Sequence, residues 1–279
     1  MKIKRYDNPF EYLEKVESFL MENEIINNLM LGLLYAAKPE DDFSKNYYGT
    51  VLDEDGNLVL AMMVSGLYLI VYGKEEGFEE EVKEAVKALI AEKIQFPGIM
   101  GPKNIANGFI KQYEKESQRT MTLQKNLRIY KLTEVNDIKV SPGAIRLGVE
   151  KDLDILVEFY KGFASAIGEP LDLSIVREKT AKLIADELIY VWEDQGQVVS
   201  MAKKGRVNKH GIVLTLVYSP PEVRGKGYAS SCVAALSRKL LDEYEYCALY
   251  TDLANPTSNS IYMKIGYEPV IDSVCYIFE

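Results

Sequence analysis

The sequence has little cysteine and almost no histidine, which limits the chemistry open to it. Only Cys232, Cys247 and Cys275 are cysteines among the 279 residues, and they show no CxxC spacing. A sparse, odd count is typical of a reducing compartment and argues against a disulfide framework. The single histidine, His210, has no partner for a metal site or for a Ser-His or Cys-His pair. We therefore expect no metal centre, and we expect the cysteines to be packing residues.

Long hydrophobic runs and excess positive charge are also absent. The longest apolar run, Leu58–Tyr72, is shorter than the roughly 20 residues of a membrane helix and contains the turn dipeptide Ser65-Gly66. The first twelve residues are too charged for the apolar segment of a secretory signal. Lysine and arginine number 33 against 42 acidic residues, for a net charge of −9. The sequence thus predicts a cytoplasmic protein with neither a membrane nor a nucleic acid as partner.

What is present is an ordinary globular composition, with 47% hydrophobic residues, over a length that suggests about two domains. Apolar spacing predicts helices at 9–20, 25–34, 79–94, 104–116, 151–166, 172–186, 228–244 and 257–264. Strands are predicted at 47–52, 58–64, 67–72, 120–132, 145–149, 188–193, 197–204, 211–218, 247–251 and 270–278, with a short one near 99. The polar, turn-rich residues 133–143 are the predicted linker. We expect domains over residues 1–135 and 144–279, each with a similar order of elements and its own sheet.

One segment, residues 211–231, suggests a ligand site. Its apolar strand must end at Pro220 and Pro221, because proline cannot donate to the hydrogen-bond ladder. Gly225 and Gly227 then lead into a predicted helix, where the first amides point outward and the helix dipole favours an anion. Pyrophosphate suits such a site, although a short glycine motif taken alone favours a plain tight turn with exposed basic residues.

Two signatures make the second half resemble the GNAT acyltransferase superfamily. The family's phosphate loop, [RQ]xxGx[GA], is matched by Arg224, Gly227 and Ala229. A later signature is matched by Asn255, by Tyr262 seven residues on, and by Gly266-Tyr267. Longer stretches around both are similar to a bacterial branch of predicted acetyltransferases and, more weakly, to the glycine N-acyltransferase-like group.

The resemblance implies an α/β (α+β) architecture with two tandem GNAT folds, each a mixed, mostly antiparallel sheet flanked by helices. It also implies a splayed cleft between the fourth and fifth strands of the second half. The implied CoA-binding residues include Asn255 on the CoA arm and a backbone N–H of Leu216 or Val217 directed at the thioester oxygen. The remaining implied contacts come from the strand end and the loop: Ser219, Arg224, Gly225, Lys226, Gly227, Tyr228, Ala229 and Ser230.

The implied general acid is Tyr262. Attack of an amine on a thioester expels a thiolate, whose conjugate acid has a pKa near ~8.5, and a phenol of pKa about 10 can donate to it. Tyr262 is also compatible with a role as a core aromatic, since the chain has 19 tyrosines. No general base is evident: Asp252 and Glu169 are candidates, but a solvated surface or capping role is the favoured interpretation of each.

The first half resembles a degenerate copy that does not bind CoA. Where a phosphate loop would lie it has Glu75 and Glu76 and lacks the arginine, so like charges would repel a pyrophosphate. This half would shape the acceptor cleft or form the surface of a homodimer.

Three functions remain open from the sequence. The first is transfer of an acetyl group from acetyl-CoA to the amine of a small molecule. The second is transfer of a longer acyl chain, and the third is a CoA-binding regulatory module without turnover. An intact Asn255 and Tyr262 favour an enzyme, because a sensor need not keep a general acid.

Overall fold

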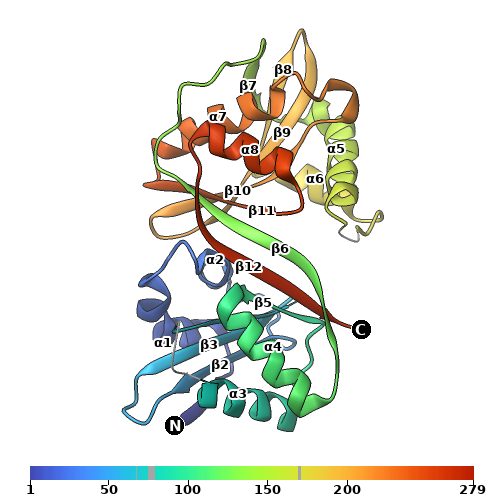
Figure 1. Cartoon of the computed structure of the whole chain (residues 1–279). Coiled ribbons are helices and arrows are strands. Elements are labelled where there is room, and N and C mark those ends of the chain that lie inside the picture. Colours follow the sequence, from blue (N-terminus) through green and yellow to red (C-terminus); the bar gives the residue numbers. More distant parts are fainter. Residues whose placement is uncertain (67, 75–78, 169–170) are drawn as a thin grey trace. The chain divides into compact units, whose positions relative to one another are not determined.

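The contacts of the chain divide it into two units in this computed structural model, which describes residues 1–66, 68–74, 79–168 and 171–279 (Figure 1). The N-terminal unit comprises Met1–Ile129, Thr251–Asn255 and Pro269–Glu279. The C-terminal unit comprises Tyr130–Tyr250 and Pro256–Glu268, so it includes residues 133–143. No helix in the described ranges is long and apolar enough to cross a membrane.

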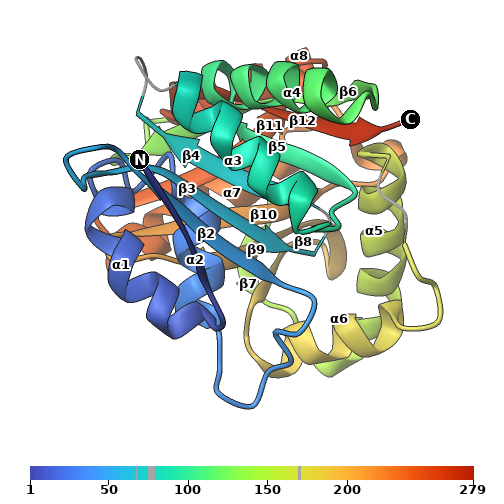
Figure 2. The ribbon, with the colours of Figure 1, turned by 90° about the horizontal axis from the view of Figure 1, so that it is seen from below.

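The N-terminal unit is a mixed sheet with helices on both sides, as Figure 2 shows. Strands β1 to β4 pair antiparallel in sequence order, β4 pairs parallel with β5, and β5 pairs antiparallel with β12. The elements are β1 (Lys2–Tyr6), α1 (Pro9–Met21), α2 (Asn28–Ala36), β2 (Tyr47–Leu52), β3 (Leu58–Ser65), β4 (Tyr68–Gly73), α3 (Glu79–Ala91), β5 (Gly98–Pro102), α4 (Lys103–Ser117), β6 (Met121–Leu132) and β12 (Glu268–Phe278).

Helix α1 begins as its sequence predicts. The Asn8 side chain accepts hydrogen bonds from the N–H groups of Phe10 and Glu11, at 3.1 and 2.9 Å, and Pro9 occupies the first turn. Strand β1, which precedes it, is not predicted by the sequence, because Lys2–Tyr6 is mostly charged and exposed. Its pairing with β2 on one edge of the sheet defines it as a strand.

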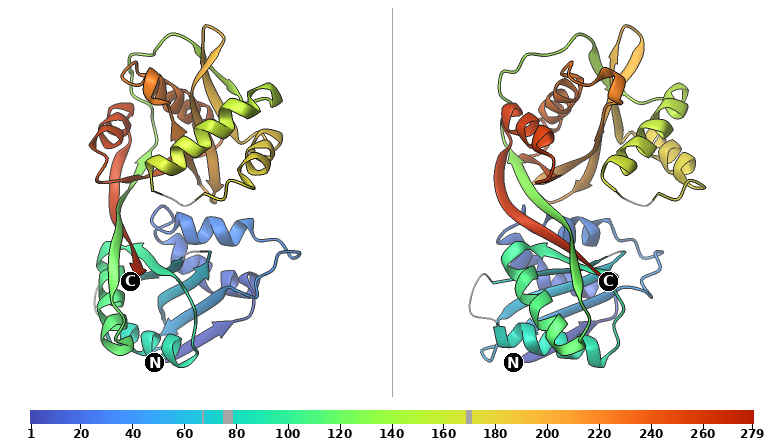
Figure 3. Two further views of the ribbon diagram at one scale, coloured as in Figure 1. Left: turned by 90° about the vertical axis from the view of Figure 1, so that its right-hand side faces the viewer. Right: turned by 45° about the vertical axis from the view of Figure 1, so that its right-hand side comes forward.

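The C-terminal unit places helices on both faces of its sheet (Figure 3). Its strands run antiparallel from β7 through β8 and β9 to β10, and β10 then pairs parallel with β11. The elements are β7 (Ala144–Leu147), the 3₁₀ turn η1 (Glu150–Asp152), α5 (Leu153–Ala166), α6 (Val176–Ala185), β8 (Ile189–Asp194), β9 (Gln197–Val207), β10 (Gly211–Tyr218), the 3₁₀ turn η2 (Pro221–Val223), α7 (Tyr228–Leu241), β11 (Tyr246–Asp252) and α8 (Pro256–Ile265).

The alternation along β8 separates the two faces of this sheet. Ile189 and Val191 are buried in the cluster formed with α5, which we call the α5 face. Tyr190 and Trp192 are buried in the cluster formed with α7, the α7 face. Because successive side chains point to opposite sides of a strand, a strand covered by helices on both faces needs apolar residues at every position.

The strands form one hydrogen-bonded series of twelve among the described residues, in the order β1-β2-β3-β4-β5-β12-β6-β11-β10-β9-β8-β7. The sequence predicts a separate sheet for each half, and on this point the expectation is corrected. Strands β6, β11 and β12 each contribute residues to both units. In the strand order these three lie between β1–β5 and β7–β10, so the series is continuous. This exchange of the last strands depends on long-range pairing, which local patterns do not encode.

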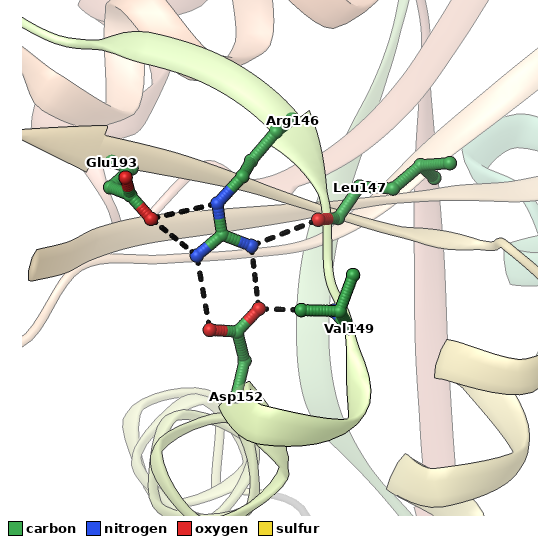
Figure 4. A network of polar contacts seen from close by, with 5 residues as sticks. All are labelled: Arg146, Leu147, Val149, Asp152 and Glu193. Atoms are coloured by element: carbon green, nitrogen blue, oxygen red, sulfur yellow. Dashed lines mark hydrogen bonds and ion pairs between the residues drawn. The ribbon is translucent and has the colours of Figure 1, made fainter. Parts of the chain in front are cut away.

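An ion-pair network fixes the start of α5 to the edge of the C-terminal sheet (Figure 4). Arg146 on β7 donates to both carboxylate oxygens of Asp152, at 2.6 and 3.0 Å, and to one oxygen of Glu193 on β8, at 2.6 and 2.8 Å. Asp152 also accepts from the Val149 N–H at 3.0 Å. Burial by itself would raise the pKa of the Asp152 carboxyl, but these hydrogen bonds outweigh burial and lower the pKa.

Candidate active site

Strand β10 carries a bulge four residues from the proline pair. Against β9, Thr215 pairs with Lys203 and Tyr218 pairs with Met201, so β10 advances three residues while β9 advances two. Leu216 absorbs the extra residue with φ of +56°, a left-handed conformation that costs a leucine about 1–3 kcal/mol. Its side chain is buried in the α5 face, which holds it there. A bulge of this kind re-aims a backbone N–H, the role expected of Leu216 or Val217.

The parallel pairing between β10 and β11 is short. It covers Gly211–Val213 against Tyr246–Ala248, whereas β10 continues to Tyr218. The part of β10 beyond Val213 therefore keeps its pairing with β9 while it leaves β11. This divergence is the splay between the fourth and fifth strands of the second half.

The segment between β10 and α7 is a tight loop with two left-handed glycines. Pro220 and Pro221 end the strand, and η2 follows at once. Gly225 has φ of +77° and Gly227, the residue that caps α7, has φ of +81°. Glycine adopts this conformation without the steric cost that other residues incur, which explains both glycines of the motif.

The end of this loop and the first turn of α7 carry backbone amides that have no backbone acceptor in the described chain. The Arg224 N–H donates to the Pro221 carbonyl at 3.2 Å, and the next amide with a backbone acceptor is that of Ser231, which donates to the Gly227 carbonyl at 3.0 Å. The N–H groups of residues 225–230 therefore make no backbone hydrogen bond within the described ranges. Residues 224–227 are exposed. These six amides, three in the loop and three in the first turn of α7, are hydrogen-bond donors that an anion at the helix N-terminus could accept from.

A serine of the predicted linker braces the loop. Ser141 Oγ donates to the Lys226 carbonyl at 2.7 Å, and the Ser141 N–H donates to Ser231 Oγ at 2.8 Å. The fit is close, since a Cβ on Gly227 would lie 2.8 Å from Ser141 Oγ. The next residue, Pro142, accepts a hydrogen bond from Trp192 Nε1 at 2.8 Å, which ties this segment to the sheet. Sequence reasoning missed Ser141, because a Ser-Pro-Gly run is typical of any turn.

The charged side chains of the loop are held differently. Arg224 Nε donates to the Ser219 carbonyl at 3.0 Å, and its guanidinium carbon lies 5.6 Å from the centre of the Tyr218 ring. Arg224 therefore stiffens the turn as well as adding charge. Lys226 is exposed. The Ser219 Oγ is buried and has no hydrogen-bond partner in the described part of the chain.

A hydrogen bond to strand β8 anchors the first residue of α7. The Tyr228 hydroxyl donates to the Asp194 carboxylate at the end of β8, at 2.6 Å, and this hydrogen bond raises the pKa of the phenol. Ala229 and Ser230 are half-buried. The side chain of Tyr228 thus packs against the sheet, while its amide remains without a backbone acceptor in the described chain.

Tyr262 lies on α8 within the cluster of the α7 face. Its side chain is 8% exposed, packs edge-on against Tyr267 with the ring centres 6.0 Å apart, and makes no hydrogen bond to any described residue. Burial raises the pKa of its phenol to about 12. Nearby Asn259, on the same helix, accepts from the Tyr130 hydroxyl at 2.9 Å. Tyr262 therefore combines a core position with a hydroxyl that no protein group engages in the described ranges.

Asn255, Asp252 and Glu169, the other residues predicted for the site, are not part of the glycine loop. Asn255 lies in the turn before α8 and clusters with the N-terminal unit; its N–H donates to the Asp252 carbonyl at 3.0 Å. The Asp252 carboxylate accepts from the Ala254 N–H at 2.8 Å, a local turn contact. Glu169 lies outside the described residues, as do Glu75 and Glu76. The relation of Asn255 to the loop remains a prediction.

Comparison with solved structures agrees with this fold over the whole chain. An acetyltransferase of the GNAT family from Colwellia psychrerythraea is similar at 15% identity, with 100% of both chains covered and a TM-score of 0.63. A GCN5-related N-acetyltransferase from Sphaerobacter thermophilus shares 13% identity over 98% of this chain and 94% of that one, with a TM-score of 0.63. A tandem GNAT protein from the clavulanic acid biosynthesis pathway covers 99% and 98%, at 10% identity and a TM-score of 0.55.

The chain thus has the tandem GNAT fold that its sequence predicts. Within it, residues 194–277 match the family model described as FR47-like protein, which is GNAT-related. That region begins at the end of β8 and includes the bulged strand, the glycine loop and Tyr262. No protein of curated function matches the chain by sequence.

Proposed function

We propose that the C-terminal unit is an acyl-CoA-dependent N-acyltransferase that moves an acetyl group from acetyl-CoA to the amine of a small molecule. The observation that carries this proposal is the run of backbone amides without a backbone acceptor at residues 225–230, between a bulged strand and the first turn of a helix. Donors in this arrangement suit the two linked phosphates of CoA, and the positive end of the α7 dipole adds to the attraction. The buried, unpartnered Ser219 Oγ is a further polar group that a bound CoA arm would satisfy.

In this proposal the bulge places a backbone N–H of Leu216 or Val217 against the thioester oxygen. The incoming amine forms a C–N bond at the thioester carbon, the C–S bond breaks, and the amine nitrogen releases a proton to solvent. A fixed donor at the oxygen stabilises the charge that develops there, and such donors are worth about 2.7–4 kcal/mol elsewhere. The strand edge freed beyond Val213 would accompany the extended arm of CoA.

Tyr262 acts on the departing sulfur. With a pKa of about 12 its phenol stays protonated throughout the neutral range. Complete proton transfer to a thiolate, whose conjugate acid has a pKa near ~8.5, would cost roughly 5 kcal/mol, which favours a hydrogen-bond donor over a full proton donor until solvent completes the transfer. The refined role of Tyr262 is therefore to stabilise the thiolate as the C–S bond breaks.

Calorimetric titration with acetyl-CoA tests the binding part of the proposal. We expect saturable binding below millimolar ligand, and no binding at millimolar acetyl-CoA would remove the proposal. Release of free CoA thiol is then followed with acetyl-, butyryl- and octanoyl-CoA across a panel of small amines. A clear preference for acetyl-CoA supports the stated donor; a preference for octanoyl-CoA would assign a longer acyl chain instead. Binding with no thiol release for any amine would indicate a regulatory module.

A further inference from the structure

A lysine lies beside the bulge, on the face of the sheet that α5 covers. Lys203 on β9 pairs with Ile189 on one side and with Thr215 on the other. Directly paired residues on neighbouring strands point to the same face, and Ile189 belongs to the α5 face. Met201, two residues before Lys203 on the same strand, is buried in that face as well. Lys203 therefore projects among apolar neighbours, one residue away from the bulge at Leu216.

Among the residues that the structure describes, no acidic side chain balances the charge of Lys203. The residue is half-buried, and no carboxylate in the described ranges forms an ion pair with it. Burial lowers the pKa of its ammonium group, and the positive charge of Arg206, three residues along β9, lowers the pKa further. Arg206 itself lies over the ring of Tyr250 at 5.8 Å. Two cations thus occupy one strand next to the reacting region.

A half-buried cation without a counter-ion is costly, and an anion that enters the site removes that cost. The bulge fixes where the thioester would lie, and Thr215, which faces Lys203, is the residue before the bulge. An anionic group held by Lys203 would therefore lie close to an amine that attacks the thioester carbon, at a separation that one small molecule can span. This spacing fits a small molecule that carries both groups.

We propose that Lys203 forms an anion subsite of the acceptor site, so that the acceptor is a small primary amine bearing an anionic group, such as an amino acid or an amino phosphate. This inference rests on the proposed acyltransferase function. Lys203 is a specificity-determining residue that binds substrate in its charged form; it does not act as the general base. Arg206 adds to the positive potential of the subsite.

The test compares amine acceptors with and without an anionic group. Thiol release from acetyl-CoA is measured with β-alanine and phosphoethanolamine, which carry a carboxylate or a phosphate, and with β-alaninamide and ethanolamine, which carry no anionic group. We expect kcat/KM to favour an anionic member by about 10- to 100-fold, the range of one charge-assisted hydrogen bond. Lys203→Met is expected to reduce this preference to within about twofold, while the acetyl-CoA dissociation constant from calorimetry stays unchanged. The two anionic arms distinguish a carboxylate from a phosphate.

Two variants separate charge recognition from other roles. Lys203→Arg keeps a cation and should retain most of the preference, whereas a general base would be lost in this variant. Lys204→Met is the matched control, because Lys204 pairs with Leu214 of the α7 face and so points to the opposite side. It should keep both turnover and preference.

A binding measurement keeps the inference testable if turnover is slow. The CoA complex is titrated with N-acetyl-β-alanine and with N-acetylethanolamine, and the anionic compound should bind more tightly to the wild type but not to Lys203→Met. Equal use or equal binding of charged and neutral compounds, including no binding of either, would overturn the inference. A failure to bind acetyl-CoA at all would instead count against the proposed function.

Discussion

At the scale of single residues, Tyr262 and Tyr267 are similar side chains that differ in their hydrogen bonding. Both are buried aromatics of one cluster and lie edge to face. The Tyr267 hydroxyl shares a hydrogen bond with Ser237 Oγ at 2.8 Å, whereas the Tyr262 hydroxyl has no partner in the described structure. A buried hydroxyl that contributes no bond to folding is a candidate for a role in binding or reaction.

Tyr262→Phe is expected to reduce kcat by about 10²-fold or more, since donation to a leaving group contributes on that order. The acetyl-CoA dissociation constant should change by less than about threefold, and the free energy of unfolding by less than about 1 kcal/mol, because no hydrogen bond is lost. The measurements are initial rates of thiol release, calorimetry and urea unfolding. Because the pKa of Tyr262 is raised to about 12, the wild type should show no loss of kcat from its ionisation up to pH about 10.

Tyr267→Phe is the matched control for this substitution. It removes one buried hydrogen bond and leaves Ser237 without it, so we expect a stability loss of about 1 kcal/mol with kcat unchanged. If Tyr262→Phe and Tyr267→Phe had the same effect on turnover, the thiolate role of Tyr262 would be wrong.

At the scale of elements, the unit that matters is the sequence of strand, bulge, turn and helix from β10 to α7. Its geometry depends on two left-handed glycines and on a serine from a distant part of the chain. The strand end is fixed by Arg224 and the helix start by Tyr228. The amides are therefore held in place before any ligand arrives, which reduces the entropy that binding would cost.

Gly227→Ala is expected to weaken acetyl-CoA binding by about tenfold or more, because φ of +81° strains an alanine and its Cβ would displace Ser141. Gly196→Ala is the control. Gly196 has φ of +76° in the β8–β9 turn of the same unit, and a Cβ there meets nothing within 4 Å. Both variants should lose similar stability, measured by urea unfolding, but only Gly227→Ala should lose affinity in calorimetry. Equal affinities would remove the loop from the binding site.

Ser141→Ala tests the brace directly. It deletes the hydrogen bond to the Lys226 carbonyl but keeps the backbone bond to Ser231, so the loop should loosen and not unfold. We expect the acetyl-CoA dissociation constant to rise about 3- to 10-fold, in line with the roughly 1 kcal/mol of one hydrogen bond. Ser174→Ala serves as a control, because that serine bonds only to Asp172 in an exposed turn. An unchanged dissociation constant in Ser141→Ala would show that the loop holds its shape without the brace.

At the scale of the whole molecule, the two units can be followed separately during unfolding. The only tryptophan in the sequence, Trp192, is buried in the C-terminal unit, so its fluorescence reports on that unit. Circular dichroism reports on both units. Two probes are needed, because a chain of two units need not unfold in one step.

The Arg146 network predicts how the C-terminal unit responds to acid. The pKa of Asp152 is lower in the folded state than in the unfolded chain. Between these two pKa values the unfolded chain binds more protons, so the free energy of unfolding rises with pH in that range. The contribution is complete above pH about 4 and is lost as the pH falls through the lower pKa of the folded state. Asp152→Asn should therefore lower the free energy of unfolding at pH 7 by about 2 kcal/mol and flatten its decline below pH about 4.

Asp154→Asn, two residues further along, is the control. Its partner Arg177 and its own carboxylate are 61% and 85% exposed, so the loss should stay below about 1 kcal/mol at pH 7. Urea unfolding is followed by Trp192 fluorescence at pH 7 and at pH 3. Parallel pH profiles for wild type and Asp152→Asn would show that the network does not govern acid stability.

The sequence by itself determined the fold class and the loop. A strand that ends in two prolines, followed by paired glycines and a helical pattern, is a local arrangement, and local sterics settle it. The Asn8 cap and the helices α5, α7 and α8 are likewise encoded in nearby residues. The GNAT resemblance rested on such contiguous motifs, and the tandem fold it implies is the one observed.

Only the tertiary structure decided which distant residues join that loop. Ser141 lies 85 residues from Lys226, and the face on which Lys203 lies depends on strand register and on a bulge, neither of which a short window of sequence specifies. The joining of β12 and β6 into one strand series likewise depends on pairing between segments far apart in the chain. Neighbouring residues determine the local backbone conformation. Strand register and the contacts of Ser141 with the loop depend instead on packing between distant segments.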